Sequence, residues 1–298
     1  MKKLKKGDIV GIISPAGFVK KEADLNLAIA LLKSWGLKVK LGKYVFARSN
    51  HFAGTDTQRA ADFQNFLDDK EIKAIWCTRG GYGSVRILNS LDFTRFRKNP
   101  KWIVGYSDIT VFHHAIALFG LESIHAMMPT STASILESKT AVSSLKKALF
   151  GEDLSYKITP NKYNKLGKAT GEIIGGNLSL LASLLGTEYA LNTKGKILFI
   201  EEIGEYKYAI DRMFQSLKLN GYFKNCKALI LGGFTDIKKN DPLFGLTIEE
   251  LILAIVKEYD FPVCFDFEAG HITNNHALIF GRNSSIEVKK SSVVLNLS

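Results

Sequence analysis

The serine at position 107 lies in a pattern that could expose a nucleophile. Apolar residues at 102–105 predict a buried strand, and apolar residues at helical spacing over 108–119 predict a helix directly after it. A serine in a tight turn between strand and helix resembles a nucleophile elbow, where backbone N–H groups at the helix start can stabilise an oxyanion. The usual pattern GxSxG is incomplete, because Ile109 replaces the second glycine. A simple helix cap at Ser107 or Asp108 stays open on this motif alone.

A second turn, RGGYG at 79–83, directly follows the predicted strand 74–77. Glycine permits close backbone approach, so N–H groups of this turn could line an anion or oxyanion site. A role in packing alone is the alternative. The turn lacks the full spacing of a dinucleotide-binding fingerprint, and no Walker A motif occurs in the chain.

A serine nucleophile needs a base, and His271 is the best-placed histidine. It follows Glu268, Ala269 and Gly270 in a predicted loop after a strand, whereas His113 and His114 lie inside the predicted helix 108–119. Catalytic groups are common on loops at strand ends. A purely structural histidine remains the other interpretation.

An acid that orients the base could be Glu201 or Glu202, which end the predicted strand 196–200. Successive side chains of a strand point to opposite faces, so only one of the two can face a given site. The alternative is the exposed start of the next helix, where acidic residues are favourable.

The elements that position these residues form an α/β pattern over the first 150 residues. Strands are predicted at 8–14, 37–41, 74–77 and 102–105, and helices at 22–35, 58–68, 84–90 and 108–119. This alternation predicts a parallel sheet, whose ligands bind outside the carboxyl ends of the strands. The glycine-rich turn and the Ser107 turn both fall at that edge.

The pattern changes in the polar segment that follows residue 150. We expect an N-terminal α/β domain over 1–155, a linker over 156–169 and a C-terminal domain over 170–298. The segment GEIIGG at 171–176 is interpreted as a turn. Further elements are predicted as strands at 196–200, 228–231, 263–267 and within 285–297, and as helices at 178–185, 209–219 and 248–258.

Composition excludes several other classes of protein. The chain has 298 residues, of which 46% are hydrophobic, and its net charge of +11 is spread along the sequence. No basic block alternates with aromatic residues, so we expect no nucleic-acid partner. The His, Asp and Glu residues show no metal-ligand spacing, and we expect no metal and no cofactor.

Cysteine usage and hydropathy indicate the compartment. Cys77, Cys226 and Cys264 are widely spaced, which favours reduced, buried thiols. No run of about 18 apolar residues occurs, and the apolar stretch at 9–13 is too short for a signal peptide. We therefore expect a cytoplasmic protein without a membrane partner.

Several of these motifs together resemble the murein tetrapeptide L,D-carboxypeptidases, serine peptidases that include microcin C immunity-type relatives. The resemblance runs nearly end to end, and its segments occur in the family's order. They are GDIVGIISPAG at 7–17, FAGTDTQRAADF at 52–63, TRGGYGSVRIL at 78–88, IVGYSDIT at 103–110, GGNLSLLASLLGT at 175–187, LFIEEIGEYKYAIDRMFQSL at 198–217 and GHITNNHALIFG at 270–281.

The resemblance implies a Ser-Glu-His triad made of Ser107, Glu201 and His271. It also implies an oxyanion hole made by the backbone N–H groups of Gly81 and Asp108. The implied fold pairs a glutamine-amidotransferase-like N-terminal α/β domain with a swivelling, β-rich C-terminal α/β domain, usually in a homodimer, and the site would form between the two domains.

The implied activity removes the terminal D-Ala from peptidoglycan-derived tetrapeptides in muropeptide recycling. Because this peptide carries several carboxylates, we expect Arg79, Tyr82 or Arg212 to contribute to its binding. Two alternatives remain open: an immunity-type peptidase that cleaves a peptidyl-nucleotide amide, and a non-catalytic muropeptide-binding module. The sequence leaves open whether lysine or diaminopimelate is preferred at the third position, which contacts form the dimer, and how far the domains move.

Overall fold

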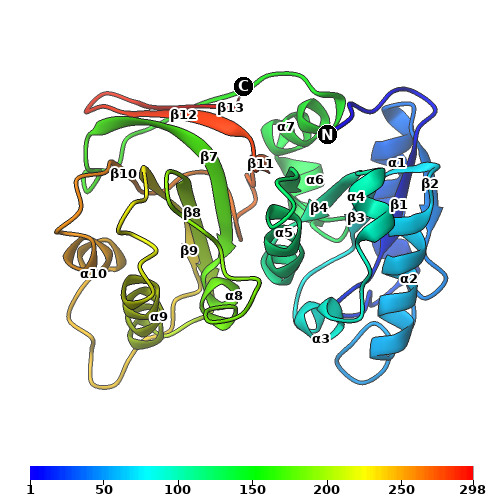
Figure 1. Cartoon of the computed structure of the whole chain (residues 1–298), viewed down its shortest axis with the longest axis horizontal. Helices are drawn as coiled ribbons and strands as arrows, with labels where there is room; N and C mark the ends of the chain where they lie inside the picture. The colour runs from blue at the N-terminus through cyan, green and yellow to red at the C-terminus, as the bar shows by residue number, and fades with distance from the viewer. Residues whose placement is uncertain (298) are drawn as a thin grey trace. The chain divides into compact units, whose positions relative to one another are not determined.

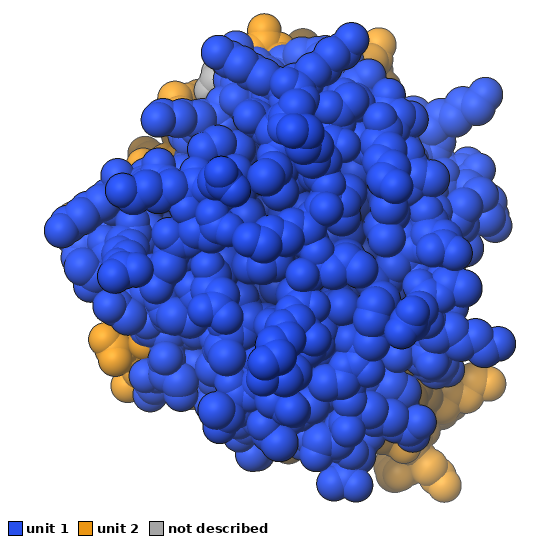
Figure 2. All heavy atoms as spheres, turned by 90° about the vertical axis from the view of Figure 1, so that its right-hand side faces the viewer, with its two compact units in different colours: residues 1–152, 273–277 blue, residues 153–272, 278–298 orange. Residues whose placement is uncertain are grey.

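A computed structural model describes residues 1–297, and these form two compact units. The first contains residues 1–152 and 273–277, and the second contains residues 153–272 and the described residues from 278 onward. Figure 1 shows the elements of each unit, and Figure 2 distinguishes the two units by colour. The chain thus passes between the units at three points of the sequence, after residues 152, 272 and 277.

The first unit is built on a parallel sheet with the strand order β5-β4-β3-β1-β2. The strands are β1 (Ile9–Ile13), β2 (Lys38–Leu41), β3 (Ile72–Cys77), β4 (Trp102–Gly105) and β5 (Ser123–His125). The central strands β1, β3 and β4 are almost wholly buried, as expected for a parallel sheet covered by helices. The predicted parallel α/β sheet is therefore confirmed.

Helices of the first unit follow the strands in alternation and pack around the sheet (Figure 1). They are η1 (Glu22–Leu25), α1 (Asn26–Ser34), α2 (Asp56–Asp68), α3 (Ser84–Leu88), α4 (Thr94–Lys98), η2 (Ser107–Ile109), α5 (Thr110–Ala117), α6 (Thr132–Glu137) and α7 (Lys139–Phe150). Helix α2 begins with a capping box, in which Thr55 accepts from the N–H of Gln58. The last two helices, α6 and α7, lie in a segment for which the sequence patterns predicted no element.

The second unit is built on a seven-stranded mixed sheet, with the order β10-β9-β8-β7-β12-β13-β6. Strands β10, β9, β8 and β7 pair in parallel, and β7, β12, β13 and β6 pair antiparallel. These strands are β6 (Leu154–Ile158), β7 (Gly167–Asn177), β8 (Ile197–Ile203), β9 (Ala228–Thr235), β10 (Val263–Cys264), β12 (Asn283–Val288) and β13 (Val293–Leu297). The other elements are α8 (Leu178–Ser183), α9 (Lys207–Leu219), α10 (Ile248–Ile255) and β11 (Leu278–Phe280).

Two expectations about the start of the second unit are wrong. The expected linker 156–169 overlaps β6, where Leu154, Tyr156 and Ile158 alternate with exposed residues and pair with β13. The predicted turn at 171–176 is the middle of β7. Its glycines serve close packing, since a Cβ on Gly175 would lie 1.8 Å from the carbonyl oxygen of Phe199 on β8.

The short segment 273–277 is held firmly in the first unit. The Asn274 side-chain oxygen accepts hydrogen bonds from the hydroxyls of Ser138 and Thr140, each at 2.5 Å, and the N–H of Ala277 donates to Ser144 Oγ at 2.9 Å. Neither unit is therefore a continuous stretch of chain. Among residues 1–297, no helix has the length and apolar character needed to cross a membrane.

Candidate active site

Ser107 lies in a strained turn at the carboxyl end of β4. Its φ is +63°, in the left-handed region that residues other than glycine rarely adopt. Such strain is tolerated where surrounding structure enforces it, and it is common in functional turns. Ile109, at the position of the second glycine of GxSxG, packs against the strand end, because a Cβ on Gly105 would lie 2.8 Å from its Cγ1. The strand–turn–helix geometry predicted for this serine is present.

The glycine-rich turn after β3 lies against Ser107. A Cβ on Gly80 would lie 2.8 Å from Ser107 Oγ and 3.2 Å from the backbone nitrogen of Asp108. The next residue, Gly81, is exposed and has a φ of +105°. The two residues expected to supply oxyanion donors, Gly81 and Asp108, thus belong to adjoining turns of one sheet edge.

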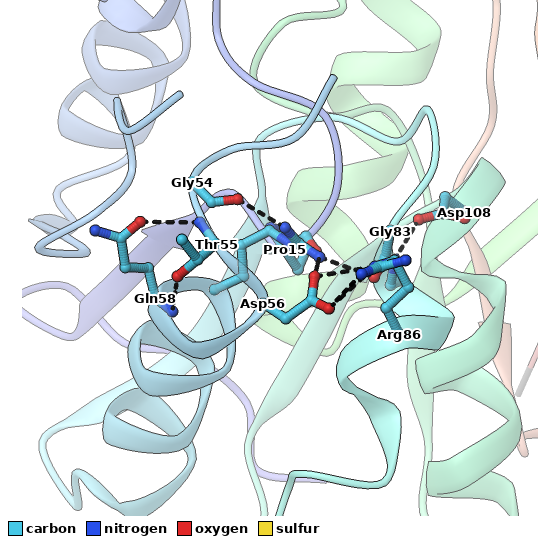
Figure 3. Close-up of polar contacts among 10 residues, drawn as sticks. Pro15, Gly54, Thr55, Asp56, Gln58, Gly83, Arg86 and Asp108 are labelled. Atoms are coloured by element: carbon cyan, nitrogen blue, oxygen red, sulfur yellow. Dashed lines mark hydrogen bonds and ion pairs between the residues drawn. The ribbon is translucent and has the colours of Figure 1, made fainter. Parts of the chain in front are cut away.

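The side chain of Asp108 joins these two turns. It is 1% exposed, and its Oδ2 accepts a hydrogen bond of 2.8 Å from the N–H of Ser84, the first residue of α3. In Figure 3, Asp108 lies beside Gly83, the residue that precedes Ser84. Burial raises the pKa of the Asp108 carboxyl, although the hydrogen bond from Ser84 favours the ionised form. Asp108 therefore caps the neighbouring helix α3 and not the helix that follows it.

Glu201 and His271 form a hydrogen-bonded pair in the second unit. Nδ1 of His271 lies 2.6 Å from Oε2 of Glu201; the glutamate side chain is 0% exposed, whereas that of the histidine is 14% exposed. Burial by itself lowers the pKa of His271, but the facing Glu201 carboxylate favours the imidazolium, and the pKa is raised. A carboxylate on Nδ1 leaves Nε2 as the nitrogen for proton transfer.

The neighbouring Glu202 has a different role, as strand alternation predicted. Its carboxylate accepts hydrogen bonds from the Asn177 side chain at 2.9 Å, from the N–H and hydroxyl of Ser179 at 2.8 and 2.6 Å, and from the N–H of Ile203 at 2.8 Å. These contacts tie the end of β8 to the start of α8. Burial raises the pKa of Glu202, against the effect of these donors.

Two contacts hold the His271 loop against the strands of the second unit. Gly270 has a φ of +105°, and a Cβ there would lie 2.7 Å from Cβ and 2.9 Å from Oε2 of Glu201. The hydroxyl of Thr235, at the end of β9, donates to the carbonyl oxygen of His271 at 3.2 Å. The Glu201–His271 pair thus depends on a glycine directly before the histidine.

The three residues predicted to bind substrate differ in their exposure and contacts. Arg79 is half-buried, and its Nη1 donates to the carbonyl oxygen of Phe18 at 3.2 Å. Tyr82 is exposed beside Phe52, with 5.8 Å between their ring centroids. Arg212 is exposed on α9, and its guanidinium lies 5.4 Å from the ring centroid of Tyr208.

His113, set aside as a base, is fully internal to the first unit. Its Nε2 lies 2.9 Å from the carbonyl oxygen of Gly105, and its Nδ1 lies 2.9 Å from Ser123 Oγ. Burial lowers its pKa to about 4. It therefore remains neutral and supports the strand that leads to Ser107.

The structure brings the predicted residues together in two sets. Ser107, Asp108 and Gly81 share one sheet edge of the first unit, and Glu201 pairs with His271 in the second. Sequence reasoning missed the residues that fix these sets: the Asp108 side chain, Gly270, and Asn177 and Ser179 beneath Glu202. Among residues 1–297, no group of three or more His, Cys, Asp and Glu side chains could hold a metal ion.

A strained serine beside a glycine turn and a carboxylate–histidine pair are the components of a hydrolase that uses a serine nucleophile. Comparisons with known proteins define the family. Residues 10–126 match the model of the LD-carboxypeptidase N-terminal domain, and residues 170–286 match that of the LD-carboxypeptidase C-terminal domain.

Individual relatives cover almost the whole chain. The probable murein peptide carboxypeptidase of Bacillus subtilis is 35% identical over 99% of this chain and 93% of its own length. The crystal structure of muramoyltetrapeptide carboxypeptidase from Oxalobacter formigenes is similar with a TM-score of 0.89 at 30% identity, covering 97% of this chain and 98% of that one. An MccF-like protein from Bacillus anthracis has a TM-score of 0.86 at 26% identity and covers 98% of each chain.

The chain therefore belongs to the LD-carboxypeptidase family and is a peptidase. The resemblance drawn from its sequence motifs is confirmed, as is the two-domain α/β architecture that the resemblance implied.

Proposed function

We propose that this protein is a serine L,D-carboxypeptidase that removes the terminal D-Ala from peptidoglycan-derived tetrapeptides. The observation that carries the proposal is the 2.6 Å pair of Glu201 and His271, together with Ser107 at a φ of +63° beside the Gly80–Gly81 turn. The names of the relatives from Bacillus subtilis and Oxalobacter formigenes support the substrate class.

The chemistry follows from these groups. Ser107 Oγ attacks the carbonyl carbon of the bond before D-Ala, and Nε2 of His271 takes its proton while Glu201 holds the ring through Nδ1. The N–H groups of Gly81 and Asp108 stabilise the oxyanion, each contributing about 3–4 kcal/mol. His271 then gives the proton to the departing amine of D-Ala. In the second half-reaction, Nε2 of His271 takes a proton from a water molecule that attacks the acyl carbon, and returns it to Ser107 Oγ as the ester bond breaks and the tripeptide leaves.

We further propose that cationic side chains bind the carboxylates of the peptide. Arg79 is the first candidate because it directly precedes the Gly80–Gly81 turn and, among residues 1–297, hydrogen-bonds only through Nη1, to the carbonyl oxygen of Phe18. Arg212, which is exposed, is a second cationic candidate, and the exposed Tyr82 is a candidate substrate-binding residue through its neutral hydroxyl. We also propose that the protein is a cytoplasmic homodimer and that its activity belongs to muropeptide recycling.

The test is D-Ala release from a purified muropeptide tetrapeptide by the wild type and by Ser107→Ala. We expect release by the wild type and a loss of at least about 10³-fold in the variant, because the nucleophile is gone. Ser34→Ala is the matched control, since Ser34 is exposed on α1 and its hydroxyl donates only to the carbonyl of Leu31. Equal release by wild type and Ser107→Ala would refute Ser107 as the nucleophile.

A second candidate function is cleavage of a peptidyl-nucleotide amide, which the similarity to the MccF-like protein of Bacillus anthracis favours. The same two proteins are assayed on a peptidyl adenylate analogue. Turnover of that compound with no D-Ala release would replace the muropeptide proposal with this one. Binding of muropeptide with neither reaction would favour a non-catalytic binding module.

A further inference from the structure

A buried arginine, Arg59 on α2, connects three backbone turns of the first unit. The residue is 1% exposed, and its guanidinium donates to the carbonyl oxygens of Pro15 at 3.0 Å, Gly54 at 2.8 Å and Gly83 at 3.4 Å. A buried charge is costly unless it is paired and fully hydrogen-bonded. The fourth acceptor is Oδ1 of Asp56, at 2.5 Å.

A second arginine and an aromatic ring complete this arrangement. Arg86 on α3 binds both oxygens of Asp56, through Nε at 3.0 Å to each and Nη2 at 2.7 Å to Oδ2. Figure 3 shows these contacts around Asp56, next to Gly83. The ring of Phe52 lies 4.7 Å from the Arg59 guanidinium and 5.1 Å from that of Arg86, measured to its centroid. Arg86 also holds the pKa of the Asp56 carboxyl below its usual value, so Asp56 stays ionised.

The contacts of Arg59 and Phe52 enclose Gly83, the last residue of the Gly80–Gly83 turn, whose first residue lies against Ser107. A Cβ on Gly83 would lie 3.0 Å from Phe52 and 3.3 Å from Nη2 of Arg59, so the carbonyl end of the turn is enclosed. At its other end, the carbonyl oxygen of Gly80 accepts from the N–H of Gly17 at 3.2 Å. Gly81 lies between these two anchors.

We propose that Arg59 is a positioning residue that fixes the Gly80–Gly83 turn and so sets the direction of the Gly81 N–H toward the oxyanion. The inference rests on the proposed function of Ser107 as nucleophile. Arginine suits this role because its planar fork donates in several fixed directions at once, which a lysine ammonium cannot reproduce. Arg59→Lys keeps the positive charge and removes the planar guanidinium with its several N–H donors.

The experiment measures kcat and KM for D-Ala release, the melting temperature, and the rate at which a fluorophosphonate probe reacts with Ser107. For Arg59→Lys we expect kcat to fall about 10- to 100-fold with KM within about threefold of wild type, because small misplacements of a catalytic group cost such factors. The rate of probe reaction should fall in parallel, since phosphonylation uses the same oxyanion donors. Arg95→Lys is the matched control, an exposed arginine paired with Asp68 at 3.7 Å, and should behave as wild type.

The outcomes separate this inference from the proposed function. A folded Arg59→Lys with wild-type kcat and probe rate would overturn it, because a purely structural arginine changes only the melting temperature. If Arg59→Lys does not fold, the test uses Asp56→Asn, which removes the charged partner of Arg59. A folded Asp56→Asn with kcat and probe rate within twofold of wild type overturns the inference. A larger fall of both quantities in parallel supports it. A wild type that reacts with the probe but releases no D-Ala refutes only the substrate, and the probe rates still test Arg59. An unreactive Ser107 in the wild type refutes both.

Discussion

The two adjacent glutamates illustrate how much one position in a strand matters. Glu201 and Glu202 have the same chemistry, yet Glu201 binds a single ring nitrogen while Glu202 accepts from four donors. A carboxylate committed to four donors has no capacity left to orient a base. Glu201 keeps one oxygen, Oε1, without a hydrogen-bond partner among the described residues. Of the two glutamates, Glu201 is therefore the one that fits the proposed role of orienting His271.

The pKa of His271, the proposed base, predicts how the activity depends on pH. His271 must be neutral to accept a proton, so activity should be present above its pKa and lost below it. Because Glu201 raises that pKa, the acid limb of kcat/KM in the wild type should have its midpoint above the usual histidine value of about 6.5. In Glu201→Gln, the largest effect that opposes burial is lost and only the weaker effects of Glu202 and Asp236 remain, so the pKa of His271 should fall while kcat drops by about 10⁴-fold.

The pKa is measured by NMR titration of the imidazole C–H signal assigned to His271. Glu188→Gln removes an exposed carboxyl elsewhere in the second unit and should leave the titration unchanged. A His271 pKa that is the same in Glu201→Gln and wild type would contradict the proposed coupling.

At the scale of elements, a glycine brings one segment close to another at each half of the proposed site. Gly80 brings the turn after β3 to Ser107, and Gly270 brings the loop after β10 to Glu201 at the end of β8. In both places a Cβ would lie within 3 Å of Ser107 or Glu201. The arrangement of the proposed site thus requires glycine at positions 80 and 270.

Gly270→Ala should therefore impair catalysis by displacing Glu201. Its Cβ would meet Glu201 at 2.7 Å in a backbone conformation with φ of +105°, and we expect a loss of stability of about 1–3 kcal/mol and a fall in kcat of at least 10-fold. Urea unfolding and steady-state kinetics measure the two effects. Gly186→Ala is matched, with a φ of +76° and no atom within 4 Å of its Cβ, and should lose stability without losing kcat. Equal kcat losses in both variants would show that the contact with Glu201 is irrelevant.

The elements also show what local sequence can and cannot predict. Alternating apolar runs and helical spacing identified the parallel sheet, and the strand–turn–helix pattern at 102–119 located Ser107, because these signals are local. The predicted turn at 171–176 is strand β7, because Gly171 and Gly175 are explained by close approach to Gly195 and Phe199 and not by a turn. The contact of Arg59 with Pro15 spans 44 residues, and that of Glu202 with Asn177 spans 25. No local periodicity encodes such partners.

At the scale of the whole molecule, the segment 273–277 returns to the first unit after most of the second has been built. A cut between Glu152 and Asp153 would therefore leave this segment still bound through Asn274 and Ala277. We predict that a protein with a protease site inserted there, once cleaved, elutes as one complex in gel filtration and keeps its D-Ala release. Asn274→Ala in the cleaved protein should weaken the complex, because the hydroxyls of Ser138 and Thr140 lose their acceptor. Separation of the cleaved wild type into free fragments would contradict this prediction.

The interrupted first unit also limits how members of this family can exchange parts by recombination. A single crossover near residue 152 would join one parent's Ser138, Thr140 and Ser144 to the other parent's residues 273–277, which those side chains must hold. Such hybrids would have mismatched hydrogen bonds at Asn274 and Ala277, three and six residues after His271. Functional chimeras should need a second exchange that transfers 273–277 together with residues 1–152, so the two units are inherited as a pair and not as independent modules.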